Sequence, residues 1–92
     1  MQRETFVHNL AQEGFPEPVT VKREPGTMEE HVHPFEAKAL ILEGEMHIRF
    51  GDDERLYSVG DVFHVPANMP HAERYGPSGV QYLAGRKMTH SA

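Results

Sequence analysis

The sequence has no cysteine, no long apolar run and no excess of basic residues. Without cysteine the chain forms no disulfide and offers no thiolate to a metal, so any metal ligand must come from His, Asp or Glu. No apolar segment approaches the roughly 18 to 20 residues of a membrane-spanning helix. The first ten residues also lack the apolar segment of a secretory signal. We therefore expect a soluble, cytoplasmic protein without a membrane partner.

Charge and length restrict the possibilities further. Fourteen acidic residues outnumber nine basic ones, which gives a formal net charge of −5. Nucleic-acid binding needs a basic face, and no basic run is longer than two residues, so no nucleic-acid partner is expected. The 92 residues suffice for a single domain over 1–92 but not for two separate cores. So small a domain leaves much surface exposed, which favours a homodimer.

Short apolar runs rich in Val, Ile, Phe and Tyr recur along the chain, separated by turn-forming residues. Regularly spaced short strands are typical of an all-β sandwich or barrel. Met46, Ile48 and Phe50 alternate with less apolar neighbours, which is the period of a half-buried strand. A weak helical tendency around Asn9 to Glu13 is interpreted as loop. The expected strands cover residues 5–7, 19–21, 39–42, 46–50, 62–65 and 80–85.

Seven histidines are present, and His31 and His33 are separated by a single residue. Residues two apart on a strand point to the same side, so both imidazoles can face one ion. A metal site normally needs at least three protein ligands. His71, which follows the turn at 66–70, is the candidate for the third. The alternative for His31 and His33 is a solvated pair on an edge strand.

The remaining histidines are given no ligand role. His47 and His64 lie within expected strands and are interpreted as packing or surface residues. His8 and His90 lie near the ends of the sequence and are expected to be solvated. Tyr75 has two interpretations: a phenol that orients a substrate, or a packed aromatic ring whose hydroxyl reaches the rim of a barrel.

The region 26–75 resembles a small single-domain cupin. The first cupin motif has a glycine, then His-x-His, then a Glu three or four residues on, and then a glycine that closes a turn. Gly26, His31, His33 and Gly44 match this motif. The match supplies two of the three histidines considered above.

The second cupin motif also has a counterpart at the spacing of the family. Gly60, Pro66 and His71 match it. Asn68 stands where the family has a second glycine, and this is a mild change because Asn tolerates a left-handed backbone. Tyr75 stands at the final Asn of the motif. Two motifs at matching spacing in one short chain make the resemblance specific.

The resemblance implies a double-stranded β-helix, or jelly-roll barrel, with a divalent metal ion (Fe, Ni, Mn or Zn) near one mouth. The carboxylate ligand of the family would fall at position 37, where this sequence has Ala37, and Glu36 stands one residue early. On a regular strand Glu36 faces away from the histidines. A bulge after His33 would instead turn it inward. The favoured interpretation is a three-histidine metal site made by His31, His33 and His71.

Three neutral imidazoles leave the charge of the ion uncompensated, which favours an anionic ligand that binds through two atoms. Three-histidine cupins similar to this one include iron-dependent dioxygenases. The resemblance therefore implies an oxygenase of a small anionic or enolisable substrate. The alternative is a non-catalytic cupin that binds a small ligand or metal as a sensor or accessory module. Small cupins commonly pair through their sheets, so a homodimer is expected, with residues 4–10 as a strand contributed to the partner.

Overall fold

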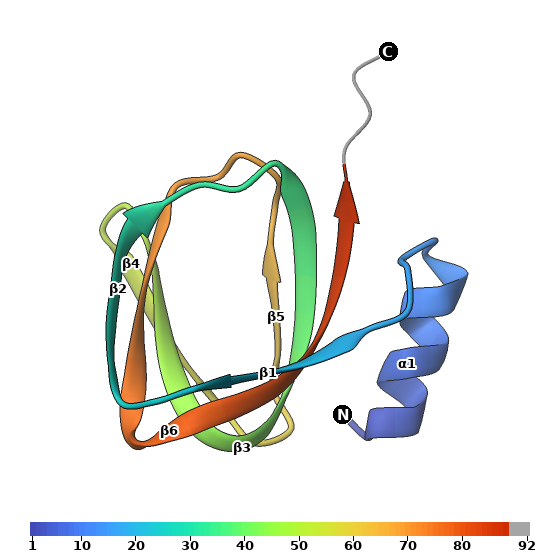
Figure 1. Cartoon of the computed structure of the whole chain (residues 1–92), viewed down its shortest axis with the longest axis horizontal. Helices are drawn as coiled ribbons and strands as arrows, with labels where there is room; N and C mark the ends of the chain where they lie inside the picture. Colours follow the sequence, from blue (N-terminus) through green and yellow to red (C-terminus); the bar gives the residue numbers. More distant parts are fainter. Residues whose placement is uncertain (89–92) are drawn as a thin grey trace.

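The computed structural model describes residues 1–88 as one helix followed by six strands (Figure 1). The strands pair antiparallel wherever they pair within this range. The predicted all-β jelly-roll fold is thereby confirmed, with an added helix. The elements are α1 (Arg3–Gln12), β1 (Val19–Arg23), β2 (Gly26–His31), β3 (Phe35–Phe50), β4 (Asp53–Ser58), β5 (Val62–Val65) and β6 (His71–Met88).

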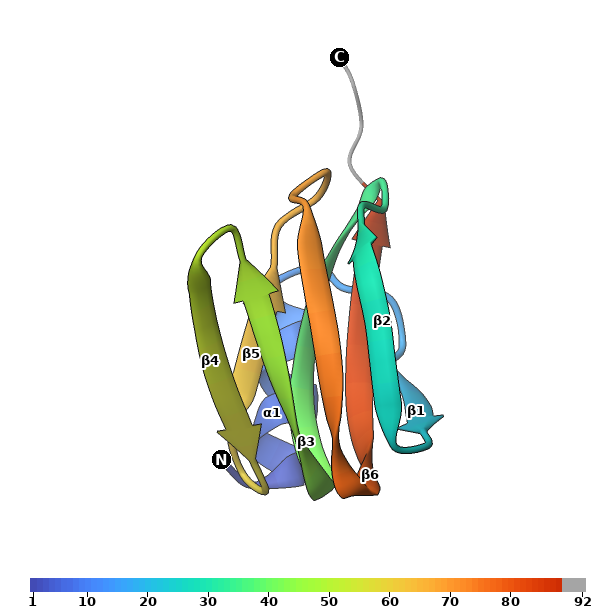
Figure 2. The same ribbon diagram turned by 90° about the vertical axis from the view of Figure 1, so that its left-hand side faces the viewer.

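Two long strands, β3 and β6, pair with each other, and every other strand of the barrel pairs with one of them. They have 16 and 18 residues and pair with each other from Phe35↔Met88 to Arg49↔Ala72. In one half of the barrel they are flanked by β4 and β2, which Figure 2 shows side by side with them. In the other half they are flanked by β5 and β1. Both long strands therefore belong to both halves.

The bend between the halves depends on glycine. The β3–β6 register is irregular between Ile41 and Glu43 and again between Gly44 and Met46. Gly44 has a φ of 73°, and a Cβ at this position would collide with the carbonyl oxygen of Gly79. A glycine is needed here both for the left-handed backbone and for the close approach of the two strands.

Apolar side chains fill the inside of the barrel. Met46 and Ile48 are almost completely buried, which confirms the alternation that predicted this strand. Every expected strand from residue 19 onward lies within an observed one. Strands β2 and β4 were not predicted, because the sequences GTMEEH and DERLYS carry few apolar residues. Edge strands with a solvated face give little apolar signal.

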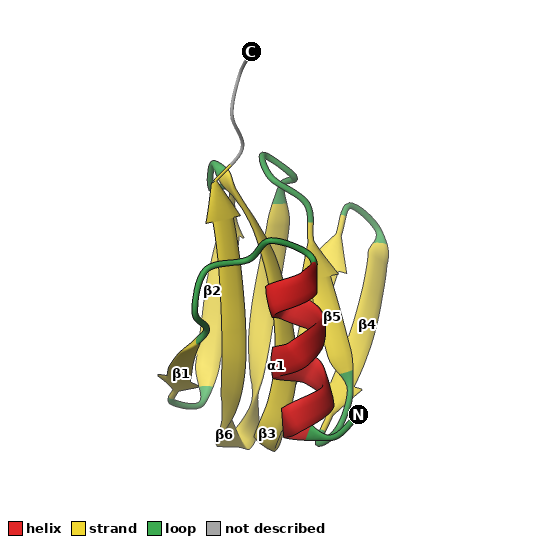
Figure 3. Ribbon diagram, turned by 90° about the vertical axis from the view of Figure 1, so that its right-hand side faces the viewer, coloured by secondary structure: helices red, strands yellow, loops and turns green. Residues whose placement is uncertain are grey.

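The N-terminal residues form a helix, and the predicted strand at 5–7 and loop at 9–13 are both wrong. Helix α1 lies against the outer face of the barrel (Figure 3). Phe6 and Leu10, one helical turn apart, are buried against Leu40 and Leu83. Their spacing of four residues is typical of a helix face. The leucines that cover this face lie far along the chain, so the segment alone does not show that it is buried.

This helix also changes the expected dimer. Residues 4–10 were predicted to form a strand contributed to a partner subunit. Because they form part of α1, and because Phe6 and Leu10 are buried within their own chain, that exchange is wrong. No helix of residues 1–88 has the length and apolar character needed to cross a membrane. His8 is exposed as expected, and His90 lies outside the described residues.

Candidate metal centre

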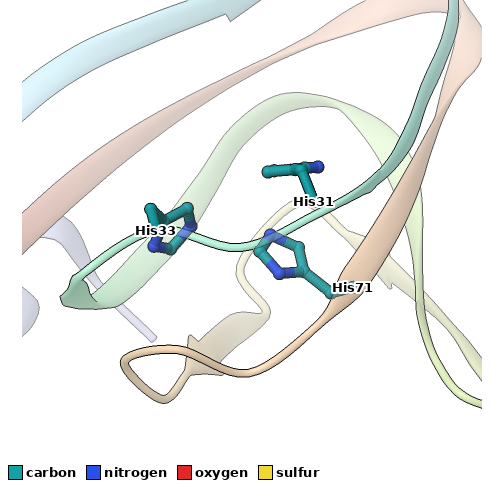
Figure 4. A group of neighbouring side chains, drawn as sticks. All are labelled: His31, His33 and His71. Atoms are coloured by element: carbon teal, nitrogen blue, oxygen red, sulfur yellow. The ribbon is translucent and has the colours of Figure 1, made fainter.

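Three histidines meet at one mouth of the barrel (Figure 4). His31 ends β2, His33 follows in the connection to β3, and His71 begins β6. His31 and His71 are paired across the β2–β6 ladder, which places their ring centroids 4.2 Å apart. One ring nitrogen of each histidine lies within 4.8 Å of those of the other two. The structure therefore brings together the three residues that the sequence singled out.

Backbone hydrogen bonds orient all three rings. Each Nδ1–H donates to the carbonyl oxygen of a residue two positions away. A carbonyl can only accept, so in the neutral ring Nδ1 carries the proton and Nε2 keeps its lone pair for a metal. The acceptors are Glu29 for His31 at 2.8 Å, Phe35 for His33 at 3.1 Å and Met69 for His71 at 2.9 Å.

The three rings differ in burial and in basicity. His71 is only 1% exposed, whereas His31 and His33 are half-buried. Burial lowers the pKa of His33, and the nearby His71 and His31 lower it further. The pKa of His71 is raised, first by its side-chain contact with the Glu73 carboxylate, with burial acting in the opposite direction. His33 is therefore more readily available than His71 in its neutral, metal-binding form.

Glu73 is a carboxylate of this site that sequence reasoning missed. It lies on the same strand face as His71 and Tyr75, because successive odd positions of β6 point to one side. Its Oε1 accepts a hydrogen bond from the Tyr75 hydroxyl at 3.0 Å. Burial alone would raise the pKa of Glu73, but the contacts with His71 and Tyr75 lower it. The spacing of two residues from His71 places Glu73 on the same strand face, but this spacing alone does not set the acid beside His31.

Tyr75 is half-buried and donates its hydroxyl hydrogen to the Glu73 carboxylate. Its pKa is raised, mainly by burial and also by the neighbouring Glu73 charge, so the phenol stays protonated and donates. Of the two interpretations offered by the sequence, the packed ring describes this position. Its hydroxyl contacts Glu73 inside the barrel.

Glu36 lies on the outer face, as the regular-strand reading predicts. Its Oε2 accepts a hydrogen bond from Nε2 of His64 at 2.6 Å, and Lys87 lies 3.9 Å from its other oxygen. Ala37 occupies the inner position beside the histidines. The β2 irregularity falls between Met28 and His31, before the histidine pair. His64 is thus a surface residue of the outer face.

A cavity of about 130 Å³ adjoins the three histidines. At about 30 Å³ per water molecule, this space corresponds to roughly four waters. Arg23 and Arg86 line it, and the Arg86 guanidinium lies 5.4 Å above the Phe35 ring. Within residues 1–88, the buried Nε of Arg23 has no hydrogen-bond partner. The cavity thus combines a small volume with two cationic side chains and the carboxylate of Glu73.

A larger hollow of about 320 Å³ lies over β2, β3, β4 and β6. It contains His47, Arg49 and an ion pair in which Arg74 donates to Glu54 at 2.6 Å. Its lining includes none of the three clustered histidines. His47 is half-buried in this hollow, which shares Glu73 with the smaller cavity. We therefore take the smaller cavity as the functional one, because it adjoins the imidazole cluster.

The antiparallel barrel with histidines at one mouth is the arrangement of a cupin. The chain matches the model of the cupin domain family over residues 19–75, more than half of its length. The protein therefore belongs to the cupin family. No curated protein matches its sequence.

Solved structures agree with this family. KdgF from Halomonas sp. is 17% identical, with a TM-score of 0.66 and coverage of 79% of this chain and 69% of that one. An RmlC-like cupin from Shewanella frigidimarina is 20% identical, with a TM-score of 0.66 and coverage of 82% and 68%. The DMSP lyase DddQ from Ruegeria pomeroyi is 25% identical, with a TM-score of 0.67 and coverage of 79% and 38%. These likenesses show the fold of the chain.

Proposed function

We propose that the chain binds a divalent metal ion through His31, His33 and His71 and performs dioxygenase-type chemistry on a small anionic or enolisable substrate. The observation that carries this proposal is the convergence of three imidazoles whose Nδ1–H groups are held by carbonyls. Such neutral rings suit borderline ions such as Zn, Fe and Ni. A bound ion would act as a Lewis acid with open positions for the substrate.

The cavity supports a small and negatively charged substrate. Its volume of about 130 Å³ admits only a small molecule. Arg23 and Arg86 bring positive charge to its lining, and a guanidinium binds a carboxylate through two parallel hydrogen bonds. The rest of the wall is largely apolar, with Phe35 and Phe63 among its members. Apolar walls exclude water and strengthen the attraction between the arginines and an anion.

The first test is elemental analysis of protein purified without a histidine tag, because a tag would itself bind metal. We expect close to one equivalent of a single divalent ion per chain. The iron-loaded protein is then mixed with a panel of thiols, β-diketones and phenols while oxygen consumption is recorded. Consumption above the rate of free iron supports the dioxygenase. Stoichiometric metal without consumption favours the alternative, a non-catalytic ligand or metal sensor, and absence of metal contradicts both.

We also propose a homodimer formed through the sheets. Strand β1 pairs along one side with β6, and its Val19 is 47% exposed. Exposed strand edges favour pairing with a second copy. Sedimentation at micromolar concentration is expected to show twice the chain mass. A species of single-chain mass with normal metal content would contradict the dimer but not the metal site.

A further inference from the structure

We propose that Glu73 is the carboxylate ligand of the metal, so that the site has three histidines and one glutamate. This inference rests on the proposed three-histidine centre and adds a donor from β6. The sequence places no acid at position 37, the inner-face position of β3 beside the histidines. Glu73 instead approaches two of the three rings, those of His31 and His71, from the opposite long strand.

The distances suit a shared ion better than hydrogen bonds. Oε2 of Glu73 lies 3.4 Å from Nε2 of His71 and 3.6 Å from Nε2 of His31. Charge-assisted hydrogen bonds from nitrogen to a carboxylate are shorter, at about 2.7 to 2.9 Å. Two donors bound tetrahedrally to one ion at about 2.1 Å are separated by roughly 3.4 Å. The observed spacing therefore leaves room for a cation between the carboxylate and both rings.

The tautomers of the rings point to the same conclusion. The carbonyls that accept from Nδ1–H of His31 and His71 leave a lone pair on each Nε2 of the neutral rings. While the rings are neutral these lone pairs face a carboxylate oxygen, which also carries lone pairs, so His31, His71 and Glu73 repel one another unless a proton on Nε2 or a metal ion lies between them. A metal ion bound by all three removes this repulsion and uses every donor.

The burial of the Glu73 carboxylate also favours a bound cation. The Glu73 side chain is only 12% exposed, and within residues 1–88 its ion-pair contacts are to His31 and His71. A buried carboxylate is strongly unfavourable unless it is paired or coordinates a metal. The Tyr75 hydroxyl satisfies Oε1, which leaves Oε2 directed at the histidines. Coordination by Glu73 would also reduce the net charge of the centre from +2 to +1.

The test compares two isosteric substitutions in the metal-free protein of residues 1–92. Glu73→Gln removes the proposed ligand, while Glu36→Gln removes a carboxylate that contacts an imidazole on the outer face. Zn²⁺ affinity is measured by competition with a chromophoric chelator. We expect Glu73→Gln to weaken Zn²⁺ affinity by roughly 10 to 100-fold or more, because loss of a residue that merely hydrogen-bonds a metal ligand already costs that much. The Zn²⁺ affinity of Glu36→Gln is expected to stay within about threefold of the wild type. An affinity for Glu73→Gln within threefold of the wild type overturns the proposal.

A spectroscopic measurement separates a ligand from a residue that merely positions His71. Co²⁺ is bound to each variant, and its visible absorption reports the donor set. Changed bands in Glu73→Gln but not in Glu36→Gln support direct coordination. Unchanged bands with weakened affinity would make Glu73 a positioning residue and overturn the proposal. A wild-type protein that binds neither Zn²⁺ nor Co²⁺ would instead refute the three-histidine centre itself.

A relocated carboxylate keeps the proposal testable if Glu73→Gln perturbs folding. Ala37 lines the same cavity from β3, so the double variant Ala37→Glu with Glu73→Gln returns an acid to the site. We expect it to recover at least tenfold in Zn²⁺ affinity over Glu73→Gln. Failure to recover, in a variant whose circular dichroism matches the wild type, counts against a direct carboxylate ligand.

Discussion

The two faces of the barrel wall each hold a carboxylate next to an imidazole, and they use it differently. On the outer face Glu36 pairs with His64 at 2.6 Å, where the two side chains are 31% and 45% exposed. On the inner face Glu73 lies 3.4 Å from His71, where they are 12% and 1% exposed. Exposed pairs are screened by water and contribute about 0 to 1 kcal/mol. The buried pair has no such screening, which is why it suits a metal ion.

The largest expected difference between the faces is in metal binding. His71→Ala removes one of three imidazole donors and is expected to abolish stoichiometric binding, because the two remaining histidines hold an ion weakly even where Glu73 adds a carboxylate. His64→Ala is the matched control, since this imidazole lies on the outer face. Calorimetric titration with Zn²⁺ measures both. Full occupancy in His71→Ala would contradict the inner-face site, and the same loss in His64→Ala would contradict the distinction between faces.

The outer face has a small core of its own, and its loss is expected to affect stability without affecting the metal. Phe6 is 1% exposed between α1 and the barrel. Phe6→Ala is expected to lower the free energy of unfolding by roughly 3 to 5 kcal/mol, because it leaves a cavity. Urea denaturation measures this loss, and Val7→Ala on an exposed helix position serves as the control. A loss below about 1 kcal/mol would mean that α1 contributes little to the fold.

The pKa values of His71 and His33 are expected to shift in opposite directions from that of an ordinary histidine. The pKa of His71 is raised by Glu73, and that of His33 is lowered by burial. In the metal-free protein the His71 contact therefore stabilises fully below the unfolded pKa of about 6.5 and is lost as pH rises through its raised pKa. His33 instead disfavours folding as pH falls below about 6.5. Proton NMR titration measures both, and the reverse order would contradict this account.

The smallest expected effect is the change in Zn²⁺ affinity caused by Glu36→Gln. Because this carboxylate faces outward, Zn²⁺ affinity is expected to remain within about threefold, whereas a ligand or its hydrogen-bond partner costs roughly 10 to 100-fold. The same chelator competition that tests Glu73 measures it. A larger loss would show that Glu36 turns inward when metal is bound.

Local patterns in the sequence were sufficient for much of the barrel. Strands such as β5 and the second half of β3 show their burial through apolar alternation or short apolar runs. The motif spacing also singled out Asn68, which adopts a φ of 60°, in the left-handed region expected of a glycine replacement. The three histidines were found because two are separated by one residue and the third follows a recognisable turn.

Sequence alone determined β1, β5 and parts of β3 and β6, and it singled out the three clustered histidines, because short apolar runs, alternation and motif spacing are readable along the chain. Tertiary structure decided that residues 3–12 form helix α1 and that Glu73 lies beside the histidines. Phe6 and Leu10 form a helical face only because Leu40 and Leu83 from distant strands cover it. Glu73 reaches the site only because the β2–β6 register sets it beside His31 as well as His71. Both depend on pairings between distant segments, which periodicity within one segment does not encode.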